Sequence, residues 1–313
     1  MPPTSPEPFR HEVLLYDGLD DLVARTVPFI AAGVRAGEPM MVAVGPGKIR
    51  AMRGALGDDA DDVTFVDMED LGRNPARIIP AWEAFLREHQ ALGRAVRGIG
   101  EPIWDGRTSE ELAECQLHEA LLNLAFADRG PFRLVCPYDR SVLEPHVLHE
   151  ARCSHPVVVD GDARIASRDF RSGDELTAPF ETPLSRPPAS TEALSFDRRT
   201  LDVVRSFTAR RAEEAGLSPS RSGDLVLAVN EIASNSVRHA GGNGVLRAWL
   251  DGADLVCEVR DPGRIEDPLV GRRSPGLDQL GGRGIWIANR VCDLVQLRSL
   301  PEGTAVRLRM RAA

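Results

Sequence analysis

The sequence lacks the long apolar stretches of membrane proteins and the cysteine pairs of disulfide-bonded proteins. No apolar run reaches the roughly 18 residues that cross a bilayer, so we expect no membrane contact. The first residues, MPPTSPEPFRHE, have no apolar core behind basic residues, unlike a secretory signal. The five cysteines form no Cys-x-x-Cys pair, which favours free thiols in a reducing compartment. Together these absences predict a cytoplasmic protein.

Basic residues are outnumbered by acidic ones: the chain has 38 Lys and Arg against 47 Asp and Glu, and the net charge is −9. Nucleic-acid binding depends on clustered cations that neutralise phosphates. We therefore expect no direct nucleic-acid binding, and partners that are proteins or small molecules. The apolar and charged fractions, 42% and 27%, are those of ordinary globular proteins, which excludes coiled coils and disordered chains.

A proline-rich segment divides the chain. Residues 171–192, RSGDELTAPFETPLSRPPASTE, carry four prolines among Ser and Thr and show no apolar periodicity. Such a composition is typical of a stiffened linker. The sequence therefore predicts two domains, residues 1–171 and 193–313, joined by a linker at 172–192.

In the first domain, short apolar runs alternate with amphipathic stretches. Met40–Val44 and Phe132–Cys136 are examples of the apolar runs, and Asn74-Pro75 begins one predicted helix. Fully apolar strands between helices indicate an α/β domain whose parallel sheet is covered on both faces. The segment VGPGKIR at 44–50 follows one strand but lacks the GxxxxGK[ST] spacing of a phosphate-binding P-loop, so we expect a simple turn.

The second domain has a different order of elements. An amphipathic pattern predicts one helix over Phe196–Ala215, and Ser218-Pro219 begins a second helix that runs to about Ala240. In the last strand, arginines alternate with apolar residues, so we expect a buried face and a solvent-exposed arginine face. The order predicts an α+β domain, with one antiparallel sheet and helices on a single face. The sheet is expected to contain two hairpins, Val245–Leu250 with Leu255–Arg260 and Asp293–Ser299 with Thr304–Met310.

The second predicted helix carries a polar stripe. Glu231, Asn235 and His239 follow one another at intervals of four residues, so they project from one helix face. An amide oxygen is a hard ligand for magnesium, and a carboxylate one turn away can orient or deprotonate a hydroxyl. Taken alone, such a stripe is more often an ordinary solvated face.

Glycines mark two further points in this domain. Asp261-Pro262-Gly263 ends a strand, where a fixed carboxylate can accept a hydrogen bond from an exocyclic amine such as that of adenine. Gly281–Gly284 precede a helix, where free N–H groups can hold phosphates and Arg283 can add charge. Thr304 begins the last strand. Each feature alone is also explained as a turn, and only their order and spacing are specific.

Taken together, these segments resemble the GHKL ATPases. NEIASNSVRHA is similar to the N box, DPG to the G1 box, GGRGIWIANRVCD to the G2 box and GTAVRLRM to the G3 strand. Within that superfamily the region from Phe196 to Met310 most resembles the RsbW-type anti-sigma factor kinases of actinobacteria. The resemblance implies a GHKL (Bergerat) ATP-binding sandwich with ATP and Mg²⁺ as cofactors.

The resemblance also implies a role for each residue. Glu231 would be catalytic, orienting or deprotonating the acceptor hydroxyl, and Asn235 would bind the magnesium. The nucleotide-binding set it implies is Asn235, His239, Asp261, Gly263, Gly282, Arg283, Gly284 and Thr304, with an ATP lid between Arg264 and Leu280. One departure concerns the G1 box, where Ile265 occupies the place of the family's usual second glycine, which puts nucleotide turnover in question more than binding.

The implied activity is that of a serine/threonine protein kinase in transcription regulation and stress response. It would phosphorylate a STAS-type anti-sigma-factor antagonist, and in the ATP-bound state it would sequester a sigma factor by partner switching. RsbW-type proteins commonly form homodimers, which is therefore an expectation here. Two alternatives stay open: a non-catalytic ATP-binding partner-switch module, and a sensor histidine kinase. The second needs a helical hairpin with an acceptor histidine, and Phe196–Ala215 contains no histidine.

The first domain resembles the MEDS sensory domain, which is related to RecA-like folds. The resemblance lies in RGIGEPIW (97–104), LHEALLNLAF (117–126), LVCPYD (134–139) and SHP (154–156), together with His11 and Tyr16. It implies a sensor for a small-molecule signal without identifying the signal.

Several polar residues of this domain are candidates for a ligand site. Glu101, His118 and Glu119 can line a pocket or serve as buried structural groups. The metal-capable residues show no recognised ligand spacing, which disfavours zinc and haem. They are His11, His118, Cys136, Cys153 and His155.

Overall fold

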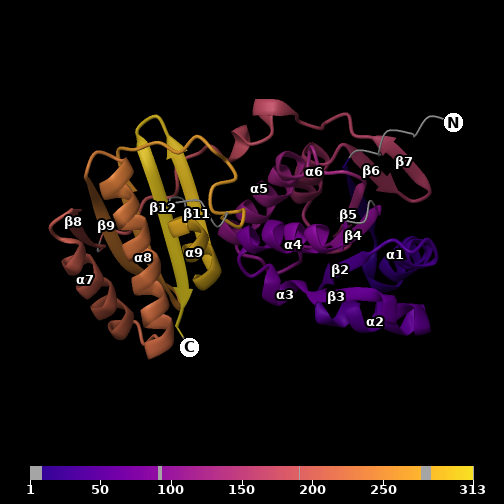
Figure 1. Ribbon diagram of the computed structural model, residues 1–313, viewed down its shortest axis with the longest axis horizontal. Coiled ribbons are helices and arrows are strands. Elements are labelled where there is room, and N and C mark those ends of the chain that lie inside the picture. The colour runs from indigo at the N-terminus through magenta and orange to yellow at the C-terminus, as the bar shows by residue number, and fades with distance from the viewer. Residues whose placement is uncertain (1–8, 91–93, 190, 276–282, 313) are drawn as a thin grey trace. The chain divides into compact units, whose positions relative to one another are not determined.

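A computed structural model describes residues 9–90, 94–189, 191–275 and 283–312. The chain forms two compact units, and the division falls between Ala178 and Pro179, inside the segment predicted as a linker. Each unit has its own sheet and its own apolar core (Figure 1). Within the described residues, no helix combines the length and the apolar character needed to cross a bilayer.

The first unit is built on a seven-stranded sheet with the order β3-β2-β4-β5-β1-β6-β7. All neighbouring strands run parallel except β7, which forms an antiparallel hairpin with β6. This confirms the predicted α/β class, with the hairpin as an addition at one edge. The strands are β1 (Arg10–Tyr16), β2 (Met40–Val44), β3 (Val63–Asp67), β4 (Val96–Gly100), β5 (Phe132–Asp139), β6 (Val157–Asp160) and β7 (Ala163–Ala166).

Side-chain capping explains where some helical segments of this unit begin. Thr108 and Glu111 form a reciprocal capping box at the start of α5. The helix predicted to begin at Asn74-Pro75 begins instead at Ile78, because the Asn74 side chain accepts the Ala76 N–H and caps a separate 3₁₀ turn. The helices are α1 (Gly18–Arg35), α2 (Pro46–Leu56), α3 (Met68–Leu71), α4 (Ile78–Gln90), α5 (Ser109–Ala125) and α6 (Pro145–Ser154).

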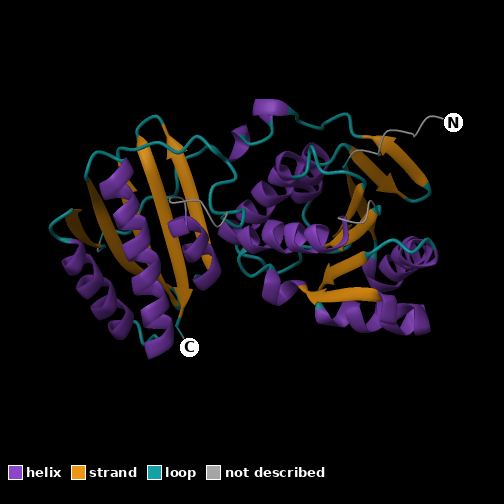
Figure 2. Cartoon of the chain, viewed as in Figure 1, coloured by secondary structure: helices purple, strands orange, loops and turns teal. Residues whose placement is uncertain are grey.

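The second unit is a five-stranded antiparallel sheet with the order β11-β12-β10-β9-β8 and three helices on one face (Figure 2). The predicted α+β class and both predicted hairpins are confirmed. The helices are α7 (Leu201–Glu214), α8 (Pro219–His239) and α9 (Arg283–Val291). The strands are β8 (Glu192–Asp197), β9 (Asn243–Asp251), β10 (Asp254–Asp261), β11 (Leu294–Leu300) and β12 (Gly303–Arg311).

The prediction of a single helix over Phe196–Ala215 is wrong at its beginning. Phe196 lies in β8, where its ring packs on the bare backbone of Gly244. The turn that follows is closed by hydrogen bonds between Asp197 and Thr200, so α7 starts only at Leu201.

The prediction of a solvent-exposed arginine face on the last strand is also wrong for Arg307. This side chain is 2% exposed and pairs with the buried Glu258 at 2.7 Å. Its guanidinium lies 5.1 Å from the centre of the Trp249 ring and donates to the Ser185 carbonyl oxygen at 2.6 Å. Ser185 belongs to the predicted linker, so part of that segment packs on the sheet face opposite the helices.

Candidate functional site

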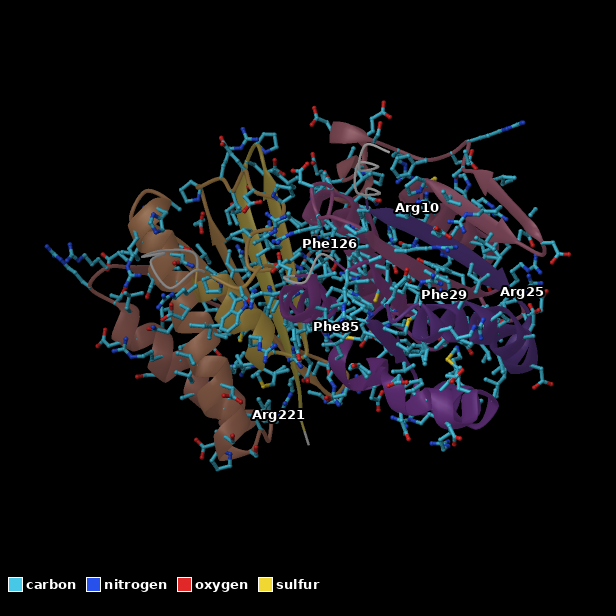
Figure 3. The ribbon with its side chains drawn as sticks, turned by 45° about the vertical axis from the view of Figure 1, so that its right-hand side comes forward. Arg10, Arg25, Phe29, Phe85, Phe126 and Arg221 are labelled. Carbon is cyan, nitrogen blue, oxygen red and sulfur yellow. The ribbon has the colours of Figure 1, made fainter. Side chains whose placement is uncertain are left out.

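The helix α8 is fixed at both its start and its packed face. Ser218 accepts the Arg221 N–H at its N-cap, and Pro219 occupies the first turn. The Arg221 side chain, labelled in Figure 3, bonds the carbonyl oxygen of Arg311 and the carboxylate of Asp293. The helix is thereby tied to the end of β12, and its polar stripe is held at a defined height above the sheet.

The stripe meets the first turn of α9. Glu231 and Asn235 are half-buried, whereas His239 is exposed. A Cβ atom on Gly284 would lie 2.6 Å from Asn235 Nδ2 and 3.2 Å from Glu231 Cβ. Only a residue without a side chain allows this approach. The structure therefore brings three of the predicted site residues, Glu231, Asn235 and Gly284, into one place.

The carboxylate of Asp261 is oriented by two donors. Its Oδ1 accepts the Gly263 N–H at 2.8 Å, and its Oδ2 accepts the Ser236 hydroxyl at 2.6 Å. A carboxylate has about four acceptor positions, so two remain for a ligand. Ser236 was not among the predicted residues, although it directly follows Asn235 in the sequence.

The turn after β10 is held by the closing hairpin. Thr304 donates its hydroxyl to the Gly263 carbonyl oxygen at 2.8 Å, and Ser299 accepts the Ile265 N–H at 2.7 Å. A Cβ on Gly263 would lie 2.5 Å from Cβ of Ala240, so glycine is required at this close approach. The Asp261 carboxylate thus lies on a backbone segment that is fixed from two sides.

These elements enclose a pocket of about 290 Å³. Its walls are mostly apolar, and its polar groups lie on α8, on the turn after β10 and on β12. A slot of this kind suits a flat aromatic ring with a few polar substituents. The apolar walls were not predicted, and Ile265, noted only as a departure from the G1 box, is one of them. The apolar residues include Ile232, Ile265, Val270, Ile285 and Val306, and the polar ones include Asn235, Ser236, His239, Asp261 and Thr304.

Other predicted residues lie beside the pocket or outside the described residues. Glu231 and Gly284 do not line the pocket but lie beside Asn235, which does. Arg283 is exposed at the start of α9. Gly282 and the end of the predicted lid fall within 276–282, outside the described residues. Earlier in the lid, Gly271 has a φ of +70° and packs on Ile285.

The first unit has a pocket of its own, of about 310 Å³, where its parallel strands end. Lys48, the only lysine of the chain, donates to Tyr16 and to Glu101, both at 2.7 Å. The Tyr16 hydroxyl donates to Glu101 at 2.6 Å, and burial raises the pKa of both Tyr16 and Glu101. The segment 44–50, predicted as a simple turn, is mostly helical: only Gly45 lies between β2 and α2, and Lys48 is in the first turn of α2.

Comparisons with known proteins assign each unit to a domain family. Residues 10–156 match the family model of the MEDS domain, described as the methanogen/methylotroph, DcmR sensory domain. Residues 194–310 match the family model of the histidine kinase-like ATPase domain. The chain therefore combines an amino-terminal MEDS domain with a carboxy-terminal GHKL-like ATPase domain.

Two solved structures are similar over part of the chain. The RsbU and RsbW domains of a Mycobacterium tuberculosis protein align with a TM-score of 0.31 and 21% identity, over 40% of this chain and 33% of that one. The Acinetobacter baumannii histidine kinase AdeS aligns with a TM-score of 0.23 and 12% identity, over 39% of this chain and 68% of that one. The chain thus spans about a third of the first of these structures. A comparison with curated proteins finds no match.

Proposed function

For a chain that joins a MEDS domain to a histidine kinase-like ATPase domain, we propose a sensor-linked, ATP-dependent serine/threonine protein kinase. Its substrate would be a STAS-type anti-sigma-factor antagonist, and its ATP-bound form would hold a sigma factor. The observation that carries the proposal is the apolar slot with Asp261 oriented on one wall and Asn235 on another.

The slot supports adenine binding in a defined orientation. The two free acceptor positions of Asp261 can receive the exocyclic amine of the purine. The apolar walls, such as Ile232 and Val306, supply surface for the ring faces. A nucleotide seated in this way directs its phosphates along α8 toward Glu231 and the first turn of α9.

The residues at that end suit phosphoryl transfer. Nδ2 of Asn235 faces Gly284, which leaves Oδ1 as the hard oxygen that Mg²⁺ prefers. When bound, Mg²⁺ neutralises charge on the transferring phosphoryl group. The N–H groups at the start of α9 and the Arg283 side chain would hold the phosphate oxygens. Glu231, one turn from Asn235, would align and deprotonate the acceptor hydroxyl.

Two measurements test this proposal. By calorimetry, the full chain should bind ATP in the presence of Mg²⁺, and Asp261→Asn should weaken binding about 10- to 100-fold, because an oriented charged acceptor is lost. With labelled ATP and a STAS-type antagonist, Glu231→Gln should abolish label transfer while ATP affinity stays within about threefold. A normal transfer rate in Glu231→Gln would remove that residue from the mechanism.

One observation favours the non-catalytic alternative. Ile265 replaces the glycine expected in the G1 box and is bonded to Ser299 through its N–H, so the start of the lid is held in place. A protein that binds ATP and a partner but moves no label onto any antagonist would support a partner-switch module.

The histidine kinase alternative lacks its acceptor element in the described residues. Between Pro179 and α7 the chain forms a 3₁₀ turn and the strand β8 in place of a helical hairpin, and α7 contains no histidine. Acid-labile phosphate on the chain after incubation with ATP would revive this alternative.

A further inference from the structure

The MEDS domain encloses four potential metal ligands that the sequence keeps far apart. His11 lies on β1, Glu119 on α5, Cys136 on β5, and His155 directly after α6. None of the four side chains is more than 1% exposed, and their ligand atoms all lie within 4.8 Å of one another. The cluster does not include Cys153 or His118.

The shortest contacts converge on Glu119 and His11. Oε2 of Glu119 lies 3.1 Å from His11 Nε2 and 3.3 Å from His155 Nε2. Sγ of Cys136 lies 3.3 Å from His11 Nε2. In a tetrahedral zinc site, bonds of 2.0–2.3 Å place neighbouring ligand atoms about 3.3–3.7 Å apart. Three of the six separations are therefore close to those of a ligand set around one ion, and the others do not exceed 4.8 Å.

Hydrogen bonds on the far side of each ring fix the tautomers. His155 Nδ1 lies 2.7 Å from the Ala151 carbonyl oxygen, which can only accept, so the ring carries its proton on Nδ1. His11 Nδ1 lies 3.2 Å from Asn123 Oδ1. The Asn123 amide is itself oriented, because its Nδ2 donates to the Ser154 carbonyl oxygen at 2.8 Å. In the neutral rings, both Nε2 atoms consequently present lone pairs to the cluster.

With both rings neutral, this arrangement brings three acceptor atoms together without a donor between them. Two imidazole lone pairs and a carboxylate oxygen repel one another at these distances unless a positive charge lies between them. Within the described part of the chain, Glu119 Oε1 has no hydrogen-bond partner, and the His155–Glu119 contact lacks hydrogen-bond geometry. Buried carboxylates without such partners are costly.

We propose that His11, Glu119, Cys136 and His155 bind one zinc ion. The nitrogen and sulfur ligands suit a borderline-soft metal and disfavour magnesium and calcium. The thiolate and the carboxylate together carry two negative charges, which balance Zn²⁺ and leave the buried site neutral. The histidines donate their other N–H to protein oxygens, as metal-bound histidines usually do.

The proposed site differs from the expectation based on spacing, which disfavoured zinc because no two candidate residues have a recognised interval. A recognised interval is expected for ligands on one hairpin or helix, whereas these ligands come from four segments that the parallel sheet brings together. Because all four ligands are protein side chains and are sealed from solvent, the ion would enter during folding and hold β1, β5 and α5 together.

Metal analysis of the full chain tests the site. Protein produced with zinc in the medium should contain about one zinc per chain, and Cys136→Ser should lose most of it. Cys153→Ser is the matched control, because Cys153 lies on α6 beside His149 and outside the cluster. Purified wild-type chain without stoichiometric metal would overturn the proposal, as would equal losses in the two variants.

Cobalt substitution supplies a readout independent of folding yield. Wild-type chain refolded with Co²⁺ should show a thiolate-to-cobalt charge-transfer band, which Cys153→Ser keeps and Cys136→Ser loses. Should Cys136→Ser fail to fold, His155→Cys replaces one ligand with another and should roughly double the intensity of the band. An unchanged band in His155→Cys, or no band in the wild type, contradicts the proposed ligand set.

Discussion

The two units hold their polar groups in opposite ways. In the MEDS domain, His11, Glu119, Cys136 and His155 are sealed from water on all sides. In the ATPase domain, Asn235 and Asp261 are half-buried, and His239 is exposed at the rim of the pocket. A sealed site suits a component that is bound once, while an open slot suits a ligand that exchanges. The difference teaches that burial, more than residue type, separates a structural centre from a ligand-exchanging one.

The largest effect is expected at the sealed site. Glu119→Gln removes the charge that faces both histidine rings, and breaking such a buried cluster should cost about 3–5 kcal/mol of unfolding free energy. Urea unfolding of the full chain should show this loss in the transition of the MEDS domain alone. Glu88→Gln, an exposed position on α4, is the control and should change stability by less than about 0.5 kcal/mol. Equal stability of the two variants would contradict the comparison.

The next effect concerns the contact between α8 and α9. Gly284→Ala places a methyl group 2.6 Å from Asn235 Nδ2, which should cost about 2–3 kcal/mol and weaken ATP binding measured by calorimetry. Gly223→Ala on α8 is the matched control, because an added Cβ there meets nothing within 4 Å. The control should be more stable by about 0.5–1 kcal/mol, since alanine favours the helix. Normal nucleotide affinity in Gly284→Ala would show that the close contact between Gly284 and Asn235 is not needed for nucleotide binding.

A smaller loss is expected at the buried ion pair of the ATPase domain. Arg307→Met leaves Glu258 with Arg260, whose Nε lies 2.6 Å away, so the cost should be only about 1–2 kcal/mol. Thermal unfolding of Arg307→Met, alone and combined with Ser185→Ala, measures how much of this loss comes from the contact with Ser185 in the predicted linker. A cost as large as that of Glu119→Gln would show that both units depend equally on sealed charges.

The smallest effect concerns one buried cysteine in each unit, Cys115 in the first and Cys257 in the second. Burial raises the pKa of Cys115 and of Cys257 to about 12, so neither thiol should be alkylated in the native protein near pH 8. Peptide mapping after iodoacetamide treatment should find both thiols modified only after unfolding. Rapid native modification of one of them would reveal a unit that opens more readily than its partner unit.

Local signals in the sequence were sufficient for most elements. The interval of four residues placed Glu231 and Asn235 on one face of α8, and the ranges Val245–Leu250 and Leu255–Arg260 predicted the β9–β10 hairpin. The strand β8 was missed because it is only six residues long and is followed closely by α7. Its apolar residues therefore read as a continuation of the apolar spacing of that helix. Propensity could not separate the two elements, because Phe196 of β8 was taken as the first apolar residue of the helix.

Long-range partners could not be derived in the same way. The alternation in β12 placed Arg307 on the face opposite the core, but its burial depends on Glu258 from β10 and on Ser185. The proposed zinc ligands are also far apart in the sequence. His11 and Cys136 meet because β1 and β5 are neighbours in the parallel sheet. Such pairs follow from topology, which no local pattern encodes.

The presence of a single lysine has a practical consequence. Apart from the α-amino group, Lys48 is the one primary amine of the chain, and its Nζ lies at the pocket formed where the parallel strands end. An amine-reactive fluorophore would therefore mark one known position on the MEDS domain. Because that amine is engaged by Tyr16 and Glu101, the rate of conjugation itself would report on whatever molecule occupies the neighbouring cavity.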